Sequence, residues 1–307
     1  MPRRLRDYLV ISLKGIAMGA ADVVPGVSGG TIALISGIYE ELITCLNNIN
    51  IALIKTLFSK GLSAAWKQLN GNFLLALFVG IGISILSLAK ALEWLLHNEP
   101  ILLWSFFFGL VLASIIFVAK QISKWNIASI IVLLIGVFIA YYISTMASLG
   151  GSDSYGFLFM AGALAICAMI LPGISGAFIL VLLGAYEPVL KALNNWDIKT
   201  IAIVGAGAIV GLLSFSKILK WLFNNYRNLT LALLTGFIIG SLYKIWPWKE
   251  VLSFRTNSKG EQVPLIEKSI LPNTYDGDPK LAFAIGLMIV GFLTITILEK
   301  LGTQTND

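Results

Sequence analysis

Six long intervals of the sequence contain no Asp, Glu, Lys or Arg, and they limit most strongly how this chain can fold. The intervals are residues 68–89, 100–119, 125–152, 200–216, 228–243 and 281–298. A helix that crosses the hydrocarbon core of a bilayer needs roughly 17–25 apolar residues. We therefore expect six membrane-spanning helices, at about 73–93, 101–119, 127–146, 200–218, 229–246 and 280–298.

The overall composition agrees with this interpretation. Only 12% of the 307 residues are charged, and 57% are hydrophobic, whereas a soluble domain carries roughly 25% charged residues. The composition excludes a disordered chain, a nucleic-acid-binding domain and an ordinary soluble enzyme. Cys45 and Cys167 are far apart in apolar sequence, so we expect no disulfide, no metal site and no cofactor. The prediction is an all-α, polytopic membrane protein that forms one domain over residues 1–307.

Two further apolar stretches, 15–39 and 154–186, are interrupted by proline and glycine. The interruptions are Pro25-Gly26 in the first stretch and Pro172-Gly173 in the second. Proline disfavours helix in the residue before it, and a broken helix in hydrocarbon is tolerated only where protein or water surrounds it. About nine residues follow each break, enough for roughly 13 Å of helix, or half a membrane. We therefore expect two re-entrant hairpins whose tips lie near the membrane midplane.

The two halves of the chain repeat one another. At an offset of 147, Pro25, Gly26, Ser28, Gly29, Ile32, Gly37, Tyr39 and Glu40 match Pro172, Gly173, Ser175, Gly176, Ile179, Gly184, Tyr186 and Glu187. Beyond 20 extra residues around 50–70 the offset is 127, and Lys90, Leu92, Trp94, Leu95 and Asn98 match Lys217, Leu219, Trp221, Leu222 and Asn225. The chain is predicted to be a duplication, with repeat 1 at about 5–146 and repeat 2 at about 155–300.

The number of crossings predicts how the repeats are oriented. One hairpin and three spans give each half an odd number of crossings, so the second half is inverted relative to the first, as in many transporters. If each broken segment crossed the membrane once, the repeats would instead be parallel, which is the less favoured alternative. The basic residues, 13 on one side against 9 on the other, place both termini in the cytoplasm.

Three segments outside the spans carry expectations of their own. Lys14 interrupts the apolar start of the chain and the repeat needs the residues that follow, so we expect no cleaved signal peptide. Residues 50–70 suit an amphipathic helix on the inner membrane surface. The polar segment 247–280 is expected to be an extracytoplasmic, solvated connector, with collection of a substrate headgroup as the alternative.

Each break is followed by small residues at the start of a helix. The first N–H groups of a helix have no internal partner and carry positive partial charge, so such starts bind anions. Close helix packing is the commoner role of small residues in membranes, but the duplication and the preceding proline favour binding here. The candidate substrate-binding residues are Ser28, Gly29, Gly30, Thr31, Ser175, Gly176 and Ala177.

Four charged residues are candidates for coupling or gating. Asp22 lies in the first arm of hairpin one, where a carboxylate is costly and is a functional candidate. Lys14, eight residues earlier, is placed to share its helix face. Glu40 and Glu187 follow the tyrosines at the interfacial ends of the hairpins, where capping and gating are equally defensible. A structural carboxylate is the alternative for Asp22.

Two enzymatic interpretations fit the residues that follow the first break. Residues 26–30 fit the Gly-x-Ser-x-Gly pattern of hydrolases, which requires a strand before the serine. Gly-x-Ser-Gly is also the nucleophile sequence of rhomboid-type intramembrane proteases, which need a histidine as base. The single histidine, His97, is expected at a span end beside Glu99. We therefore expect no catalytic residues and no enzyme.

The stretch Lys14–Thr31 resembles the signature of the polyprenyl-phosphate transporter family, and Leu171–Phe178 with Leu183–Tyr186 matches its second motif. The resemblance implies a translocase of the bacterial cytoplasmic membrane that returns undecaprenyl phosphate from the outer to the inner leaflet for cell-envelope synthesis. The implied partners are the polyprenyl phosphate and membrane lipid, without nucleic acid. A coupling proton or sodium ion is expected from Asp22 at membrane depth. The alternative is a small-anion channel or exchanger that uses the same helix starts.

Overall fold

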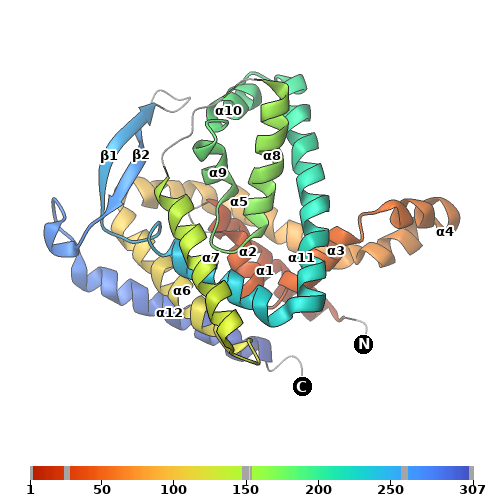
Figure 1. Cartoon of the computed structure of the whole chain (residues 1–307), viewed down its shortest axis with the longest axis horizontal. Coiled ribbons are helices and arrows are strands. Elements are labelled where there is room, and N and C mark those ends of the chain that lie inside the picture. The colour runs from red at the N-terminus through yellow and green to blue at the C-terminus, as the bar shows by residue number, and fades with distance from the viewer. Residues whose placement is uncertain (1–2, 24–27, 147–151, 153, 257–261, 304–307) are drawn as a thin grey trace.

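The structure is a computed structural model that describes residues 3–23, 28–146, 152, 154–256 and 262–303 (Figure 1). The first half contains α1 (Leu5–Val23), α2 (Gly29–Ile35), α3 (Tyr39–Asn47), α4 (Ile51–Leu69), α5 (Gly71–Asn98), α6 (Pro100–Lys120) and α7 (Ile127–Thr145). The second half contains α8 (Tyr155–Ile170), α9 (Gly176–Leu182), α10 (Tyr186–Asn194), α11 (Ile198–Ser241), β1 (Lys249–Thr256), β2 (Gln262–Ser269), the 3-10 helix η1 (Pro272–Thr274) and α12 (Leu281–Thr303). Pro25, Gly26 and Val27 lie outside the described residues.

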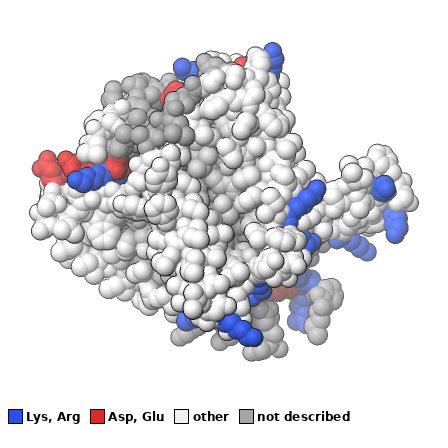
Figure 2. Space-filling model, in the orientation of Figure 1, with Lys and Arg blue, Asp and Glu red and all other residues white. Residues whose placement is uncertain are grey.

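Several helices are long and apolar enough to cross a membrane. They are Gly71–Leu88 within α5, the whole of α6 and α7, and α11, while α12 is apolar over Leu281–Thr296. On the face seen in Figure 2, the Lys, Arg, Asp and Glu side chains gather at the edges, around a broad area without charge. The expected helical, polytopic membrane protein is confirmed.

The expected spans 200–218 and 229–246 both fall within α11 and are separated by a kink. Tyr226 lies at the kink, and its φ of −137° and ψ of 44° are not helical. The equivalent position in the first half is Glu99, with φ −136° and ψ 51°, and there Pro100 begins a separate helix, α6. The helical path is therefore interrupted at the equivalent position of both halves, and the two expected spans lie on either side of the kink.

Both broken stretches form the same arrangement of short helices. The seven-residue helices α2 and α9 pack back against α1 and α8, the helices before the breaks. The next helix then turns away, by 114° between α2 and α3 and by 113° between α9 and α10. Gly37 and Gly184 make these turns with φ of 75° and 71°, a region that favours glycine. This geometry fits the two expected hairpins.

Each half is held together by an equivalent contact between two of its own helices. In the first half α1 packs against α5, and in the second α8 packs against the first part of α11. Gly15 lies against the carbonyl oxygen of Leu77, as Gly162 lies against that of Val204; a Cβ on either glycine would come closer than 3.0 Å. These residues are related by the offsets of 147 and 127, the offsets of the predicted duplication.

The third long helix of each half packs against the other half. Helix α7 packs on α11, and α12 packs on α6. Figure 1 shows the two helices of each pair side by side. Gly136 of α7 lies against the carbonyl oxygen of Leu233, and Gly291 of α12 lies against that of Phe106. The two halves thus exchange their third helices reciprocally.

Substitutions at two glycines of α5 test whether these close contacts stabilise the protein. A Cβ on Gly80 would clash with the carbonyl oxygen of Ser12 in α1, whereas nothing lies within 4 Å of a Cβ on Gly82. Because the backbone of α1 cannot move aside locally, Gly80→Ala is expected to lower the free energy of unfolding by about 1–3 kcal/mol. Gly82→Ala is the control and should be neutral or slightly stabilising. Thermal unfolding in detergent measures both, and equal melting temperatures would contradict the prediction.

Helix α4 is the inserted segment without a counterpart in the second half. Asn50 caps it by accepting hydrogen bonds from the N–H groups of Ala52 and Leu53, at 2.9 and 3.2 Å. The helix kinks at Gly61 (φ 80°) and projects from the helical body (Figure 1). Phe58 is 84% exposed, which suits the predicted position of α4 on a membrane surface.

The polar segment 247–280 contains an antiparallel hairpin of β1 and β2, in which Lys249 pairs with Ser269 and Val251 with Glu267. Within the described residues, this hairpin is where the chain departs from the expected all-α fold. The register shifts between Val251 and Ser253, and this irregularity interrupts the alternation that would have indicated a strand in the sequence. Trp248 fixes the base of the hairpin: it is buried against Ile101 and its Nε1 donates to the carbonyl oxygen of Pro279 at 3.0 Å.

Candidate functional site

The helix start of the first hairpin lies against the break of the second. Ser28 Oγ is 3.2 Å from the carbonyl oxygens of Met169 and Leu171, to which it can donate. In the other direction, the N–H of Gly173 donates to Thr31 Oγ1 at 2.9 Å. Ser28 and Thr31 are each only 1% exposed. The structure therefore joins two candidate residues of the first hairpin to the break of the second, about 140 positions away in the sequence.

The start of α2 is already occupied by a carboxylate of the protein. The N–H of Gly29 donates to Asp22 Oδ1 at 2.7 Å, and that of Gly30 donates to Ser28 Oγ at 3.1 Å. A Cβ on Gly29 would lie 2.5 Å from Asp22 Oδ2, so only glycine admits the carboxylate this closely. Asp22 thus sits where the sequence predicted that a ligand anion binds.

Lys14 satisfies the opposite end of the same short helix. Its Nζ donates to the carbonyl oxygen of Ser36, the C-cap of α2, at 2.6 Å. A helix carries positive partial charge at its start and negative partial charge at its end. Helix α1 therefore presents an acidic residue to the start of α2 and a basic residue to its end, which accounts for both buried charges of hairpin one.

The start of α9 has the same shape but lacks the carboxylate. Ser175 caps it, accepting from the N–H of Phe178 at 3.5 Å. The position equivalent to Asp22 is Met169, and a Cβ on Gly176 would lie 3.1 Å from the Cβ of Met169. Within the described part of the chain, no carboxylate is hydrogen-bonded to this helix start. The two starts thus differ in charge, although they match in sequence.

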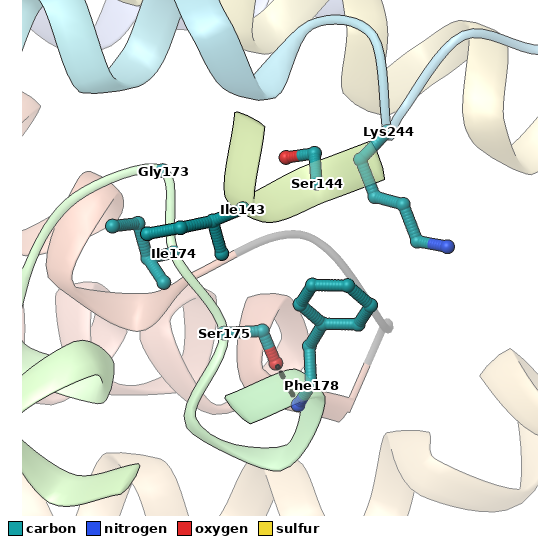
Figure 3. Close-up of a pocket in the computed structure, with 7 residues that line it drawn as sticks. All are labelled: Ile143, Ser144, Gly173, Ile174, Ser175, Phe178 and Lys244. Carbon is teal, nitrogen blue, oxygen red and sulfur yellow. Dashed lines mark hydrogen bonds between the residues drawn. The ribbon is translucent and has the colours of Figure 1, made fainter. Parts of the chain in front are cut away.

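A pocket opens beside the start of α9 (Figure 3). It is lined by Ile143, Ser144, Gly173, Ile174, Ser175, Phe178 and Lys244. Its cavity volume is about 10 Å³, room for about one water molecule. Lys244 extends from beyond the end of α11, and its Nζ lies 5.2 Å from the centre of the Phe178 ring. Lys244 and Ser175 thus line the same pocket, with the Phe178 ring between them (Figure 3).

Lys244 belongs to a cluster with two residues of the β-hairpin. Its Nζ lies 3.1 Å from Glu267 Oε2, and Lys249 Nζ lies 3.7 Å from the same oxygen. Burial lowers the pKa of Lys249 to about 8, with Glu267 opposing the shift. Burial also tends to raise the pKa of Glu267, but Lys249 and Lys244 outweigh it and hold that pKa below its usual value. Two ammonium groups thus share one carboxylate.

The other two candidates lie beyond the bends, away from the helix starts. Glu40, in the first turn of α3, pairs with Arg227 at 2.7 Å, next to the bend of α11, and both side chains are about half exposed. A surface ion pair of this kind contributes about 0–1 kcal/mol. Glu187 occupies the first turn of α10. Neither residue is brought to the junction of the hairpins.

Sequence reasoning missed the cluster of Lys244, Lys249 and Glu267. One indication was present: Lys244 falls inside the expected span 229–246, and a charge at membrane depth is a functional candidate. The other two residues gave no indication, because their proximity depends on the register of a hairpin that the sequence did not predict. His97 lies near the end of α5, and its side chain is outside the described part of the structure.

Comparison with known proteins assigns the chain to a family. The sequence matches the family described as undecaprenyl phosphate translocase-like over residues 18–263, which include both hairpins and α11. The chain belongs to this family. It is similar to the polyprenyl-phosphate transporter of Vibrio cholerae serotype O1, with 47% identity over 98% of this chain and 99% of that protein. It is also similar to the polyprenyl-phosphate transporter of Staphylococcus aureus, with 32% identity over 76% of this chain and 85% of that protein. No solved structure matches the chain.

Proposed function

We propose that this protein carries a polyprenyl phosphate, undecaprenyl phosphate in bacteria, across the cytoplasmic membrane from the outer to the inner leaflet. The names of the relatives support the substrate. The observation that carries the proposal is the contact between the start of α2, whose Gly29 N–H donates to Asp22, and the break before α9, a helix start to which no described carboxylate is hydrogen-bonded. Such a junction offers a place for the phosphate, while the isoprenoid tail stays in lipid.

The proposed orientation follows from the crossings and charges of the sequence. Both termini lie in the cytoplasm, the two halves are inverted, and the β-hairpin lies outside. In support, the ion pair of Glu40 with Arg227 joins two residues expected inside, and that of Glu99 with Lys280 joins two expected outside. The pocket with Lys244 then lies on the outer side of the junction, where a substrate moving inward would arrive.

Helix starts reduce the cost of moving a phosphate through hydrocarbon. Burying an unpaired charge is very unfavourable, so the headgroup needs donors at every stage of its passage. At the proposed site these are the first N–H groups of α9, the hydroxyl of Ser175 and, on the outer side, the ammonium group of Lys244. Preorganised donors of this kind stabilise a charge without reorganising around it.

Asp22 is proposed to couple the movement to an ion. Its carboxylate and the phosphate compete for the N–H of Gly29, because each is an anion suited to the start of α2. A proton or sodium ion bound by Asp22 neutralises the competitor and favours the phosphate at that position. Lys14 keeps the other end of α2 satisfied in both states.

Reconstitution into liposomes tests the proposal. Undecaprenyl phosphate is placed in both leaflets, and the accessibility of its headgroup to an external phosphatase is followed with and without protein. We expect the purified protein to make the whole pool accessible, whereas protein-free liposomes expose only the outer half. No protein-dependent exchange would refute lipid translocation. Passage of small inorganic anions without exchange of the lipid would instead indicate the alternative channel or exchanger.

A further inference from the structure

The β-hairpin buries a basic residue without giving it a hydrogen bond. Glu267 is opposite Val251 in the register, which places it diagonally from Lys249 on the same face of the hairpin. The side chain of Lys249 is only 8% exposed, and its Nζ lies 3.7 Å from the centre of the Trp104 ring. Among the described residues, no acceptor is hydrogen-bonded to this Nζ. Its ion-pair partner, Glu267 at 3.7 Å, leaves its N–H donors unsatisfied, which is costly for a buried ammonium group and favours binding of a further anion.

Lys244 connects this group to the pocket at the start of α9. It binds the same Glu267 oxygen at 3.1 Å and also lines the pocket beside Ser175. The side chains of Lys244 and Glu267 are 18% and 20% exposed. With two ammonium groups and one carboxylate, the cluster keeps one excess positive charge in a largely buried place.

The base of the hairpin is fixed to the segment that follows α11, so the cluster is held in position. Trp246 Nε1 donates to the carbonyl oxygen of Ile270 at 2.8 Å. Ser269 Oγ donates to the carbonyl oxygen of Tyr243 at 2.9 Å. These bonds anchor the end of β2 beside the segment that carries Lys244. Glu267, two residues from Ser269, can change rotamer without moving the strand.

We propose that Lys244, Lys249 and Glu267 form a capture site for a phosphate monoester, from which the headgroup passes to the pocket at Ser175. The inference rests on the proposed function and names the place where the substrate is first held. Glu267 occupies the site when it is empty, and the arriving phosphate displaces it from the two ammonium groups. A phosphate monoester carries about 1.5–2 negative charges and three acceptor oxygens, which match two lysines better than one carboxylate does.

Three variants and a control test the capture site. Lys244→Gln and Lys249→Met remove one ammonium group each, and Lys249→Met keeps an apolar side chain against Trp104. Lys268→Gln removes the same charge from the adjacent exposed residue of β2. Binding of farnesyl phosphate is followed by tryptophan fluorescence, with farnesol and inorganic phosphate as the comparison ligands. Lys244→Gln and Lys249→Met are each expected to weaken binding about tenfold, because a charge-assisted hydrogen bond is lost, whereas Lys268→Gln should bind as the wild type does.

Glu267→Gln separates competition from a structural role. If Glu267 competes with phosphate, its amide should bind farnesyl phosphate several-fold more tightly, opposite to the lysine variants. If Glu267 only holds the hairpin in place, all three variants should weaken binding together, and the proposal is overturned. If Lys249→Met does not fold, the opposite effects of Lys244→Gln and Glu267→Gln still decide the question.

The pH profile provides a second readout. Lys249 is faced by Glu267 and Lys244, and by the uncharged ring of Trp104. Because the pKa of Lys249 is about 8, its ammonium form is lost as the pH rises through that value, and binding of farnesyl phosphate should fall over the same range. Lys249→Met should remove this fall, and an unchanged profile would count against a direct contact.

The comparison ligands and transport separate three outcomes. Binding of inorganic phosphate as tight as that of farnesyl phosphate would identify a free-phosphate site and overturn capture of the lipid. Wild-type translocation with unaltered binding in Lys244→Gln and Lys249→Met would overturn the capture site but leave the proposed function intact. Tight binding of farnesyl phosphate without any translocation by the wild type would support capture and refute transport.

Discussion

Asp22→Asn is expected to slow translocation of undecaprenyl phosphate at least about tenfold while the protein remains folded. The carboxylate accepts from the N–H of Gly29 at 2.7 Å, and the amide oxygen of asparagine can make the same bond without the charge. A charge-assisted hydrogen bond contributes about 1.5–3 kcal/mol, and about 1.4 kcal/mol corresponds to a tenfold change. If Asp22 binds the coupling ion, the remaining transport should no longer respond to an imposed ion gradient.

Asp7→Asn is the matched control for this substitution. Asp7 lies at the beginning of the same helix, α1, and among the described residues it accepts from the nearby N–H of Arg4, at 2.7 Å. Its replacement removes the same charge far from the junction of the hairpins and should leave both rate and ion response unchanged. A wild-type rate and gradient response in Asp22→Asn would show that the carboxylate has only a structural role. The measurement is headgroup exchange in liposomes, with the melting temperature recorded for each variant.

Gly30→Ala is expected to abolish most transport by separating the two hairpins. A Cβ on Gly30 would come closer than 3.0 Å to the carbonyl oxygen of Ile170, at the end of α8. Because the clash involves backbone on both sides, α2 must move away and the hydrogen bonds of Ser28 and Thr31 to the second hairpin are strained. We expect a loss of about 1–3 kcal/mol in the free energy of unfolding. Translocation should fall more than about tenfold, as expected when donors are misplaced by about 1 Å.

Gly156→Ala provides the comparison, because nothing lies within 4 Å of a Cβ at this position of α8. It should leave melting temperature and transport at wild-type values. A Gly30→Ala protein that melts lower but transports normally would show that the contact between the hairpins serves stability alone. A variant that melts normally and fails to transport would place the effect in the movement of the hairpins.

Much of the fold followed from two simple patterns. The charge-free intervals predicted the long helices, since hydrocarbon excludes charged side chains along a span. Pro172-Gly173 and the matching Pro25-Gly26 predicted the two interruptions. What these patterns do not contain is which helices pack together. The exchange of α7 and α12 depends on contacts such as Gly136 with Leu233 and Gly291 with Phe106, which local periodicity does not encode.

The candidate site was predicted less completely than the fold. The sequence indicated both helix starts, and the structure brings Ser28 and Thr31 to the second break. The difference between the starts could be seen only in the structure, because Asp22 reaches the N–H of Gly29 across a folded hairpin. The register of the β-hairpin likewise brings together the charges of Lys244, Lys249 and Glu267. Their positions in the sequence do not indicate that they are close in space.

The reciprocal exchange of α7 and α12 makes the halves dependent on each other for folding. A first half made alone would lack the helix that covers α6, and its own α7 would have no α11 to cover. Two separate half-length chains would therefore be complete only as an intertwined dimer, with each subunit lending a helix to the other. A single chain fixes the ratio of the halves at one to one. It also frees each half to diverge, as the single carboxylate at position 22 and the single lysine at position 244 already show.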